Sequence, residues 1–160
     1  MPLDEDIAFF EQVPLLALLG EEALRILAIG AESRAVAHGM VLFYAGDLAD
    51  GGYLVQSGSF LLEPDTLNDG QEKRGMKVGA GTLLGELALV TDTVRVSTAT
   101  ALEPSTVMRI PRSLFLKMLE GYPAAAGRLR DAMAERVDAF SREVESMKSK
   151  IDPADSANRA

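Results

Sequence analysis

Two charged residues stand inside otherwise apolar runs of this sequence, and they are the residues best suited to chemistry. Glu86 lies in the run from Leu83 to Val90, and Arg95 lies nine positions later in the run from Val94 to Ala101. A buried charge is costly unless a partner offsets it. Either the two side chains pair with each other across a turn, or the space between them holds a ligand that carries both an anion and a hydroxyl group.

The groups around the pair favour a nucleotide of low charge as that ligand. An arginine fork and the free N–H groups at the start of a short helix, Gly85 to Ala88, suit a phosphate. A carboxylate repels phosphate, so Glu86 is expected to accept a hydrogen bond from a ribose hydroxyl. Gly85 lets the backbone approach the ligand closely. A triphosphate would call for a GxxxxGK[ST] loop, which the sequence lacks.

The composition excludes several classes of enzyme. The 160 residues include no cysteine, which removes disulfides, thiolate nucleophiles, iron–sulfur clusters and cysteine zinc sites. Metal cupins need two or three histidines, and this sequence has only His38, which precedes Gly39 in a predicted turn. Apart from Glu86, no carboxylate stands out as one member of a catalytic pair. We therefore expect a protein that is not an enzyme, with no metal and no catalytic residue.

The charge and hydropathy patterns limit the kinds of partner that the protein can bind. With 24 acidic and 16 basic residues the net charge is −8, which disfavours nonspecific nucleic-acid binding but leaves room for one small anion site. No apolar run approaches the roughly 18 residues of a membrane span. The first residues are acidic, where a signal peptide would be basic. These patterns predict a cytoplasmic protein with no membrane contact.

Periodicity divides the chain into four parts. Apolar residues recur at three- and four-residue steps in residues 1–32, which predicts short helices broken at Gly20. Short apolar runs separated by glycine turns fill residues 33–110 and predict a β-roll of the jelly-roll type, a double-stranded β-helix. Residues 111–148 read as helices again, and 149–160 as a flexible tail. The predicted fold is mainly β with flanking helices.

Three segments receive more specific predictions. Residues 83–90 are compatible with either a strand or one helical turn, and residues 63–74 read as a flexible hairpin tip. The helix from Pro123 to about Lys148 carries a heptad seam of apolar residues. That seam either packs on its own roll or forms a parallel helix pair in a homodimer. Both arrangements can exist together if different faces of the helix make the two contacts. Its residues are Met133, Val137, Phe140, Val144 and Met147.

The segment from Gly85 to Ala101 resembles the phosphate-binding cassette of cyclic-nucleotide-binding domains. In sequence it reads GELALVTDTVRVSTATA, within a cassette that we place at residues 79–101. The segment from Val41 to Gly58 resembles the early strands of the same family and their paired glycine turns. The family includes catabolite-activator-type regulators, regulatory subunits of cAMP-dependent protein kinase and cyclic-nucleotide-gated channels. The resemblance spans about residues 7–147.

The resemblance implies roles for individual residues. Glu86 would accept from the ribose 2′-hydroxyl, and Arg95 would bind the cyclic phosphate. The long helix would act as a mobile lid, with Phe140 against the base and Ser141 as a polar option. Backbone groups would complete the cradle at Gly85, Leu87, Ala88, Val96 and Ser97.

Two departures from the family pattern bear on the ligand. Val94 precedes Arg95 where the family often has proline. Val96 follows Arg95 where members that respond to cGMP often have threonine. The resemblance therefore favours cAMP, with cGMP as the second candidate and the Ser97 hydroxyl as a weaker argument for it.

The expected function is that of a non-catalytic sensor that binds a cyclic nucleotide and signals by movement of its C-terminal helix. Too few residues follow Lys148 for a helix-turn-helix module, so we expect no DNA binding by this chain. Its effector protein is not identified by the sequence. Two alternatives remain: an interaction module of the same fold with a degenerate nucleotide site, or a fragment of a larger regulator or channel.

Overall fold

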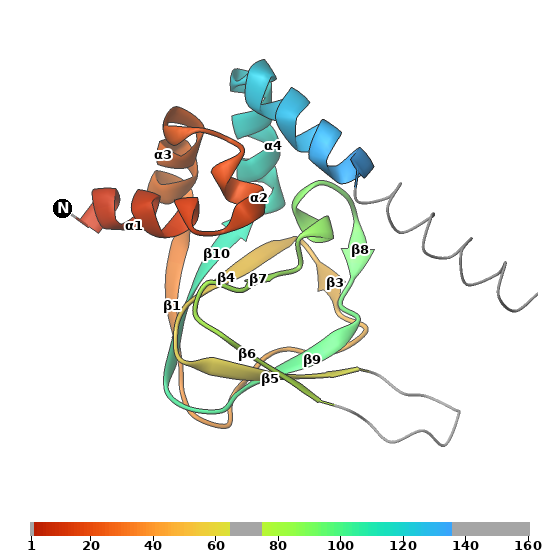
Figure 1. Cartoon of the computed structure of the whole chain (residues 1–160). Helices are drawn as coiled ribbons and strands as arrows, with labels where there is room; N and C mark the ends of the chain where they lie inside the picture. Colours follow the sequence, from red (N-terminus) through yellow and green to blue (C-terminus); the bar gives the residue numbers. More distant parts are fainter. Residues whose placement is uncertain (1, 65–74, 136–160) are drawn as a thin grey trace, which may run out of the picture.

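The computed structural model describes residues 2–64 and 75–135, and these form a β-roll with helices packed at one end (Figure 1). The helices precede and follow the strands along the chain. Their bounds are α1 Pro2–Glu11, α2 Pro14–Ala17, α3 Glu21–Gly30 and α4 Arg112–Gly121, and residues 123–135 are also helical. The prediction of a mainly β fold with N-terminal and C-terminal helices is confirmed.

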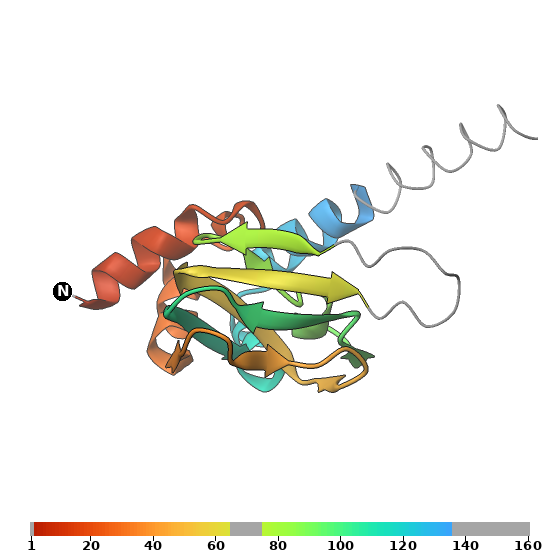
Figure 2. The same cartoon turned by 90° about the horizontal axis from the view of Figure 1, so that it is seen from below.

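The strands of the roll form antiparallel sheets. Two sheets have four strands each, in the orders β1-β10-β4-β7 and β2-β9-β5-β6, and β3 pairs with β8 in a small third sheet (Figures 1 and 2). The bounds are β1 Glu32–Val36, β2 Val41–Phe43, β3 Leu48–Ala49, β4 Gly51–Ser57, β5 Ser59–Pro64, β6 Met76–Gly79, β7 Leu83–Leu84, β8 Thr93–Val94, β9 Ser97–Ala101 and β10 Ser105–Pro111.

The N-terminal helices are separated by residues that suit helix ends. Pro14 occupies the first turn of α2, where its missing N–H costs nothing. Gly20 has a φ of +90° immediately before α3, a conformation that side chains with a Cβ rarely adopt. Arg128, from the last helix, donates hydrogen bonds to the carbonyls of Leu18 and Leu19. The start of the C-terminal helix is thereby attached to the turn between α2 and α3.

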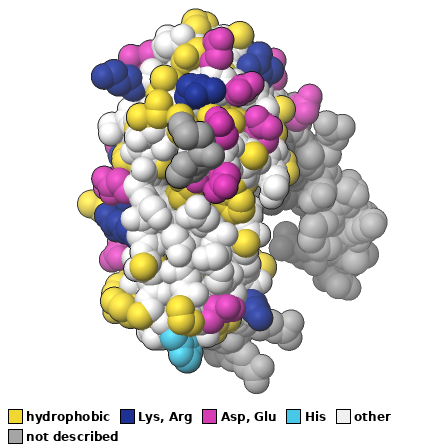
Figure 3. Space-filling view, turned by 90° about the vertical axis from the view of Figure 1, so that its left-hand side faces the viewer, with side chains coloured by type: hydrophobic (Ala, Val, Ile, Leu, Met, Phe, Trp, Pro, Cys, Tyr) yellow, Lys and Arg dark blue, Asp and Glu magenta, His cyan; other side chains and the backbone are white. Residues whose placement is uncertain are grey.

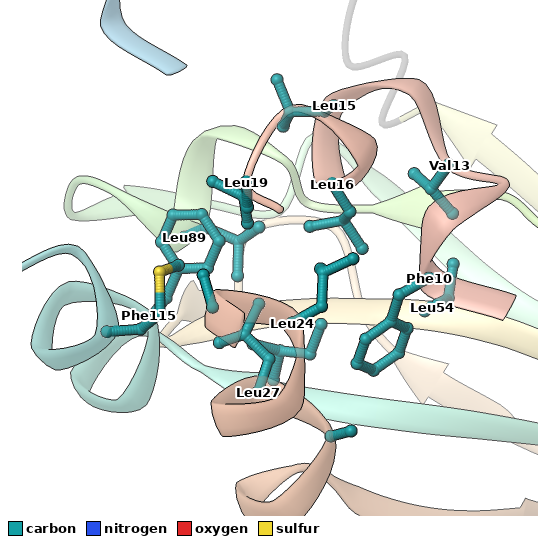
Figure 4. Packing of buried hydrophobic residues seen from close by; sticks show 14 of the residues in the cluster. Phe10, Val13, Leu15, Leu16, Leu19, Leu24, Leu27, Leu54, Leu89 and Phe115 are labelled. Atoms are coloured by element: carbon teal, nitrogen blue, oxygen red, sulfur yellow. The ribbon is translucent and has the colours of Figure 1, made fainter. Parts of the chain in front are cut away.

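The buried side chains form two clusters. The helical core lies between α1 to α4 and the adjacent face of the roll, and Figure 4 shows Phe10, Leu16, Leu24, Leu27 and Phe115 within it. The roll core lies between the two larger sheets and consists of Val36, Tyr53, Val55, Phe60, Leu84, Ala99, Ala101 and Val107. Strand β4 serves both, because successive side chains of a strand point to opposite faces.

The segments left open by the sequence adopt definite structures. Residues 83–90 contain both predicted alternatives, a strand and a helical turn. Strand β7 is followed by the single 3₁₀ turn η1, Leu87–Leu89. The run predicted as one strand from Val94 to Ala101 is two strands, because Arg95 and Val96 lie between β8 and β9. Met133, first in the predicted heptad seam, packs against the helical core. The other seam residues and most of the predicted hairpin tip lie outside the described residues.

Candidate functional site: a pocket around Arg95

A pocket of about 430 Å³ opens beside the predicted cassette. That volume lies within the usual range for small-molecule sites. Most of the lining is apolar, and the polar contributions include Glu86, Arg95 and Ser97. The apolar wall on the side of β5 and β6 consists of Leu62, Met76 and Val78. The pocket therefore offers one cationic group, one carboxylate and a wall suited to a flat apolar ring.

Gly85 lies within the cassette, just before η1, at a position that only glycine fits. Its φ is +81°, and a Cβ at this position would overlap Nη1 of Arg95 and lie 3.3 Å from the carbonyl oxygen of Gly51. The turn η1 follows at once, with Glu86 in its N-cap position. The local chain thus passes directly over the guanidinium, so a ligand that reaches Arg95 also meets this turn of backbone.

Contacts of both the backbone and the side chain fix the position of Arg95. Its N–H donates to the carbonyl of Asp47 at 2.8 Å, and its own carbonyl accepts from Gly46 at 2.7 Å. Its Nη2 donates to the carbonyl oxygen of Gly51 at 2.8 Å. The guanidinium carbon lies 4.4 Å from the ring centroid of Phe43 and 5.4 Å from that of Tyr53, within cation–π range.

The remaining terminal nitrogen of Arg95 has unused hydrogen-bonding capacity. The residue is 7% exposed, and Nη1 has no hydrogen-bond partner among the residues that the structure describes. A pair with Glu86, the alternative that the sequence left open, does not satisfy Nη1. An unpartnered buried donor costs about 1–3 kcal/mol, so an anion that accepts from Nη1 gains that energy back on binding. Arg95 is one of the residues that line the pocket.

Burial acts on the charge of Arg95. It lowers the pKa of the guanidinium from its usual value, and the charge of Arg109 acts in the same direction, whereas Tyr53, Asp50 and Asp47 favour the charged form. An arginine guanidinium keeps its proton in proteins because its unperturbed pKa lies far above physiological pH. The pocket therefore contains a permanent cation whose hydration has been largely removed.

The other predicted site residues are distributed around the same pocket. Gly85, Leu87, Ala88, Val96 and Ser97 all line it with Glu86 and Arg95. The N–H of Ala88 is engaged in the turn, where it donates to the carbonyl of Gly85 at 3.0 Å. Val96 is 79% exposed. The predicted base contacts, Phe140 and Ser141, lie outside the described residues.

Sequence reasoning missed the residues that hold Arg95. Phe43 and Tyr53 belong to different sheets, and their rings stack with centroids 5.9 Å apart beside the guanidinium. In the sequence, both residues look like ordinary apolar residues of a strand. Their contact with Arg95 forms only when the two sheets face each other. The anchor at Gly51 is a main-chain carbonyl, which no residue pattern marks.

The face of the molecule that carries α1 and β1, which Figure 3 displays, has no broad positive field. Acidic and basic side chains lie close to one another there, gathered mainly toward the helical end. Arg109 forms ion pairs with Asp50 at 2.7 Å and with Glu32 at 3.6 Å. Burial lowers the pKa of Arg109, but the charge and hydrogen bond of Asp50 and the charge of Glu32 outweigh it and raise the pKa.

A comparison with family models identifies the family of the chain. The family model described as the cyclic nucleotide-binding domain matches residues 33–122, which include the whole roll, the cassette and α4. The chain belongs to the cyclic nucleotide-binding domain family. The resemblance that the cassette residues carried is thus confirmed at the level of the family, while the ligand itself is a separate question.

Three proteins illustrate the relationship. The cyclic AMP receptor protein of Thermus thermophilus is 31% identical over 124 residues, which cover 78% of this chain and 57% of the receptor. An uncharacterised NTE family protein of Mycobacterium tuberculosis is 34% identical over 122 residues, 76% of this chain and 20% of that protein. The solved structure of a cyclic nucleotide-binding-like protein from Brucella abortus is 35% identical with a TM-score of 0.63, covering 72% and 98% of the two chains. The chain thus spans less than two thirds of either curated relative.

Membrane-spanning helices and metal-ligand clusters are both absent from the part of the chain that the structure describes. None of the helices in residues 2–64 and 75–135 is long and apolar enough to cross a bilayer. Within the same residues, no group of three histidine, cysteine, aspartate or glutamate side chains is placed to hold a metal ion. His38 is exposed in the turn between β1 and β2, as its predicted position before Gly39 suggested.

Proposed function

We propose that the protein is a non-catalytic cyclic-nucleotide sensor whose ligand is cAMP in preference to cGMP. The observation that supports it most directly is that Arg95, which lines the pocket, has a buried Nη1 with no hydrogen-bond partner in the described part of the chain. A cyclic phosphate carries one negative charge and several acceptor oxygens. It matches a single desolvated arginine better than a more highly charged phosphate would.

The chemistry of the pocket residues assigns positions to the ribose and the base of the nucleotide. Glu86 lies on the same pocket and accepts from the ribose 2′-hydroxyl in this proposal, while the backbone of the cassette from Gly85 to Ala88, with Val96 and Ser97, surrounds the phosphate. The base lies on the apolar wall of Leu62, Met76 and Val78. Val96 offers guanine no hydroxyl, which favours adenine, and the name of the Thermus relative also refers to cyclic AMP.

The signal in this proposal passes to the helices after the roll. Residues 33–110 bind the ligand, 79–101 form the cassette, 111–148 transmit occupancy and 149–160 are a tail. The nucleotide stabilises a lid-closed state by binding it more tightly than the open state. Phe140 and Ser141 contact the base in the closed state, and the helix of residues 123–148 forms a homodimer. The protein acts in the cytoplasm on an effector protein, without contacting DNA or a membrane.

Calorimetry tests the proposal directly. The protein is titrated with cAMP and with cGMP, together with Arg95→Ala and the control Arg34→Ala, an exposed arginine of β1 whose ion pair with Glu32 is remote from the pocket. We expect heat with both nucleotides, tighter binding of cAMP, and a loss of about 1.5–3 kcal/mol for Arg95→Ala because charge-assisted bonds are lost. Arg34→Ala is expected to bind as the parent does.

Two results would contradict the proposal. If millimolar cAMP and cGMP release no heat and leave the melting temperature unchanged, the site is degenerate and the domain serves protein interaction alone. If Arg95→Ala binds cAMP as tightly as Arg34→Ala, the nucleotide does not use the cassette.

A further inference from the structure

Arg112 makes a concentrated set of hydrogen bonds outside the pocket. It is the first residue of α4, and its side chain is 20% exposed. Nη1 donates to the carbonyls of Ala49 at 2.9 Å, Thr91 at 3.0 Å and Ala88 at 3.3 Å. Nη2 pairs with the carboxylate of Asp92 at 2.6 Å. One guanidinium therefore joins α4 to two separate segments of the roll.

The two segments held by Arg112 are also the two that build the phosphate site. Ala88 and Thr91 belong to η1 and the residues directly after it, and η1 follows the Gly85 turn that lies over Arg95. Ala49 precedes by two residues Gly51, whose carbonyl anchors Arg95. The main chain of Arg112 adds a further bond, from its N–H to the carbonyl of Asp50 at 2.7 Å. We call residues 49–51 the arginine-anchoring segment.

The arginine-anchoring segment is packed too tightly to move independently of the strand that leads into α4. Gly51 pairs with Pro111 in the register of β4 and β10. A Cβ at Gly51 would overlap the carbonyl oxygen of Ile110 and lie 2.9 Å from Cα of Pro111. Helix α4 also packs directly against η1 and β4. A displacement at Arg95 or η1 therefore reaches the first turn of α4 through bonded and closely packed groups.

We propose that Arg112 is the positioning residue that holds the cassette turn and the arginine-anchoring segment in one geometry and couples this geometry to α4. This inference rests on the proposed function, since the event being coupled is nucleotide binding. The planar fork of arginine serves carbonyls and a carboxylate at once, whereas lysine offers a single point charge and glutamine no charge. When a phosphate draws η1 and Arg95 together, the bonds of Arg112 make the first turn of α4 follow.

Amide hydrogen exchange separates coupling from a merely structural role. Exchange is measured on the parent, Arg112→Gln and the control Arg130→Gln, an exposed arginine, without nucleotide and at saturating cAMP. In the parent and the control we expect cAMP to slow exchange about fivefold or more in both residues 87–91 and residues 112–118. In Arg112→Gln we expect roughly tenfold weaker cAMP binding, with protection of 87–91 retained at saturation and protection of 112–118 lost.

Each outcome bears on the inference. Unchanged cAMP-dependent protection of residues 112–118 in Arg112→Gln overturns it, whatever happens to the affinity, because a residue that only stabilises the fold would leave that response intact. An absence of calorimetric heat with the parent overturns the proposed function and the coupling together. Binding by the parent with a failure confined to the helix response overturns the coupling alone.

A milder variant covers the case in which Arg112→Gln does not fold. Asp92→Asn removes only the charge of the partner at Nη2 and leaves the three carbonyl bonds in place. We expect a partial loss, by about half, of the cAMP-dependent protection in residues 112–118. Full protection in Asp92→Asn, combined with an unfolded Arg112→Gln, overturns the inference, because Arg112 would then serve stability only.

Discussion

The helical core and the roll core differ in what they leave unfilled. Among the described residues, the helical core contains large side chains with no exposed surface, including Phe10, Leu24 and Phe115, and it extends over all four labelled helices. The roll core is smaller and includes the small residues Ala99 and Ala101. The roll core borders the pocket, because Leu84 and the partly buried Phe43, Leu62 and Val78 belong to both. The helical core supplies the stability that an open pocket cannot.

Strand β4 shows how one element serves both regions. Leu54 points into the helical core, while its neighbours Tyr53 and Val55 point into the roll core. The turn η1 is divided in the same manner, since Leu89 is buried in the helical core and the other side of η1 borders the pocket. The helical core therefore supports the proposed phosphate site from behind.

The largest expected effect is on the stability of the helical core. Leu24→Ala removes a side chain with no exposed surface and leaves a cavity, so the free energy of unfolding should fall by about 2–5 kcal/mol. Leu62→Ala makes the same chemical change on the pocket wall, where solvent and ligand space are already present. It should cost less than about 1.5 kcal/mol.

Urea unfolding measures both variants. Equal losses for Leu24→Ala and Leu62→Ala would show that the two regions are packed alike, and the proposed division between a stabilising region and a binding region would be wrong.

The next effect is on binding, at two glycines of the roll. Gly85→Ala and Gly81→Ala both place a Cβ on a residue with positive φ, so each should destabilise the fold by about 1–2 kcal/mol. Only the Cβ at Gly85 meets Arg95, because nothing lies within 4 Å of the Cβ at Gly81. Gly85→Ala should therefore weaken cAMP binding by about 1–3 kcal/mol through displacement of the guanidinium.

Calorimetry and thermal melting together separate the two contributions. Gly81→Ala should lose stability and keep its affinity. A comparable loss of affinity in both variants would mean that backbone strain, and not contact with Arg95, accounts for the effect.

The smallest expected effect concerns the aromatic rings beside Arg95. Phe43→Leu keeps an apolar side chain but removes a ring 4.4 Å from the guanidinium carbon. Cation–π contacts contribute about 0.5–2 kcal/mol, so cAMP affinity should fall roughly threefold to thirtyfold. Phe43→Tyr keeps the ring and should bind as the parent does. If Phe43→Leu and Phe43→Tyr bind cAMP with the same affinity in the titration, the ring only fills space beside Arg95.

The sequence predicted the fold and singled out two residues of the pocket, Glu86 and Arg95, because both depend on local patterns. Glycine turns between short apolar runs indicate a roll, and Glu86 and Arg95 stand out as charges within apolar runs. The supports of Arg95 were not predictable in this manner. Phe43 and Tyr53 come together only when two sheets face each other, and Arg112 looks like any basic residue at the start of a helix. These roles arise from long-range packing.

The anchoring of Arg95 on a main-chain oxygen has a consequence for redesign of the ligand preference. A side-chain anchor can be lost by a point mutation, whereas the Gly51 carbonyl is present whichever side chains surround it. The wall of Leu62, Met76 and Val78 lies on other strands from this anchor. In the proposed binding mode, a library that varies the wall alone therefore explores new base preferences while the contact between Arg95 and the phosphate stays constant.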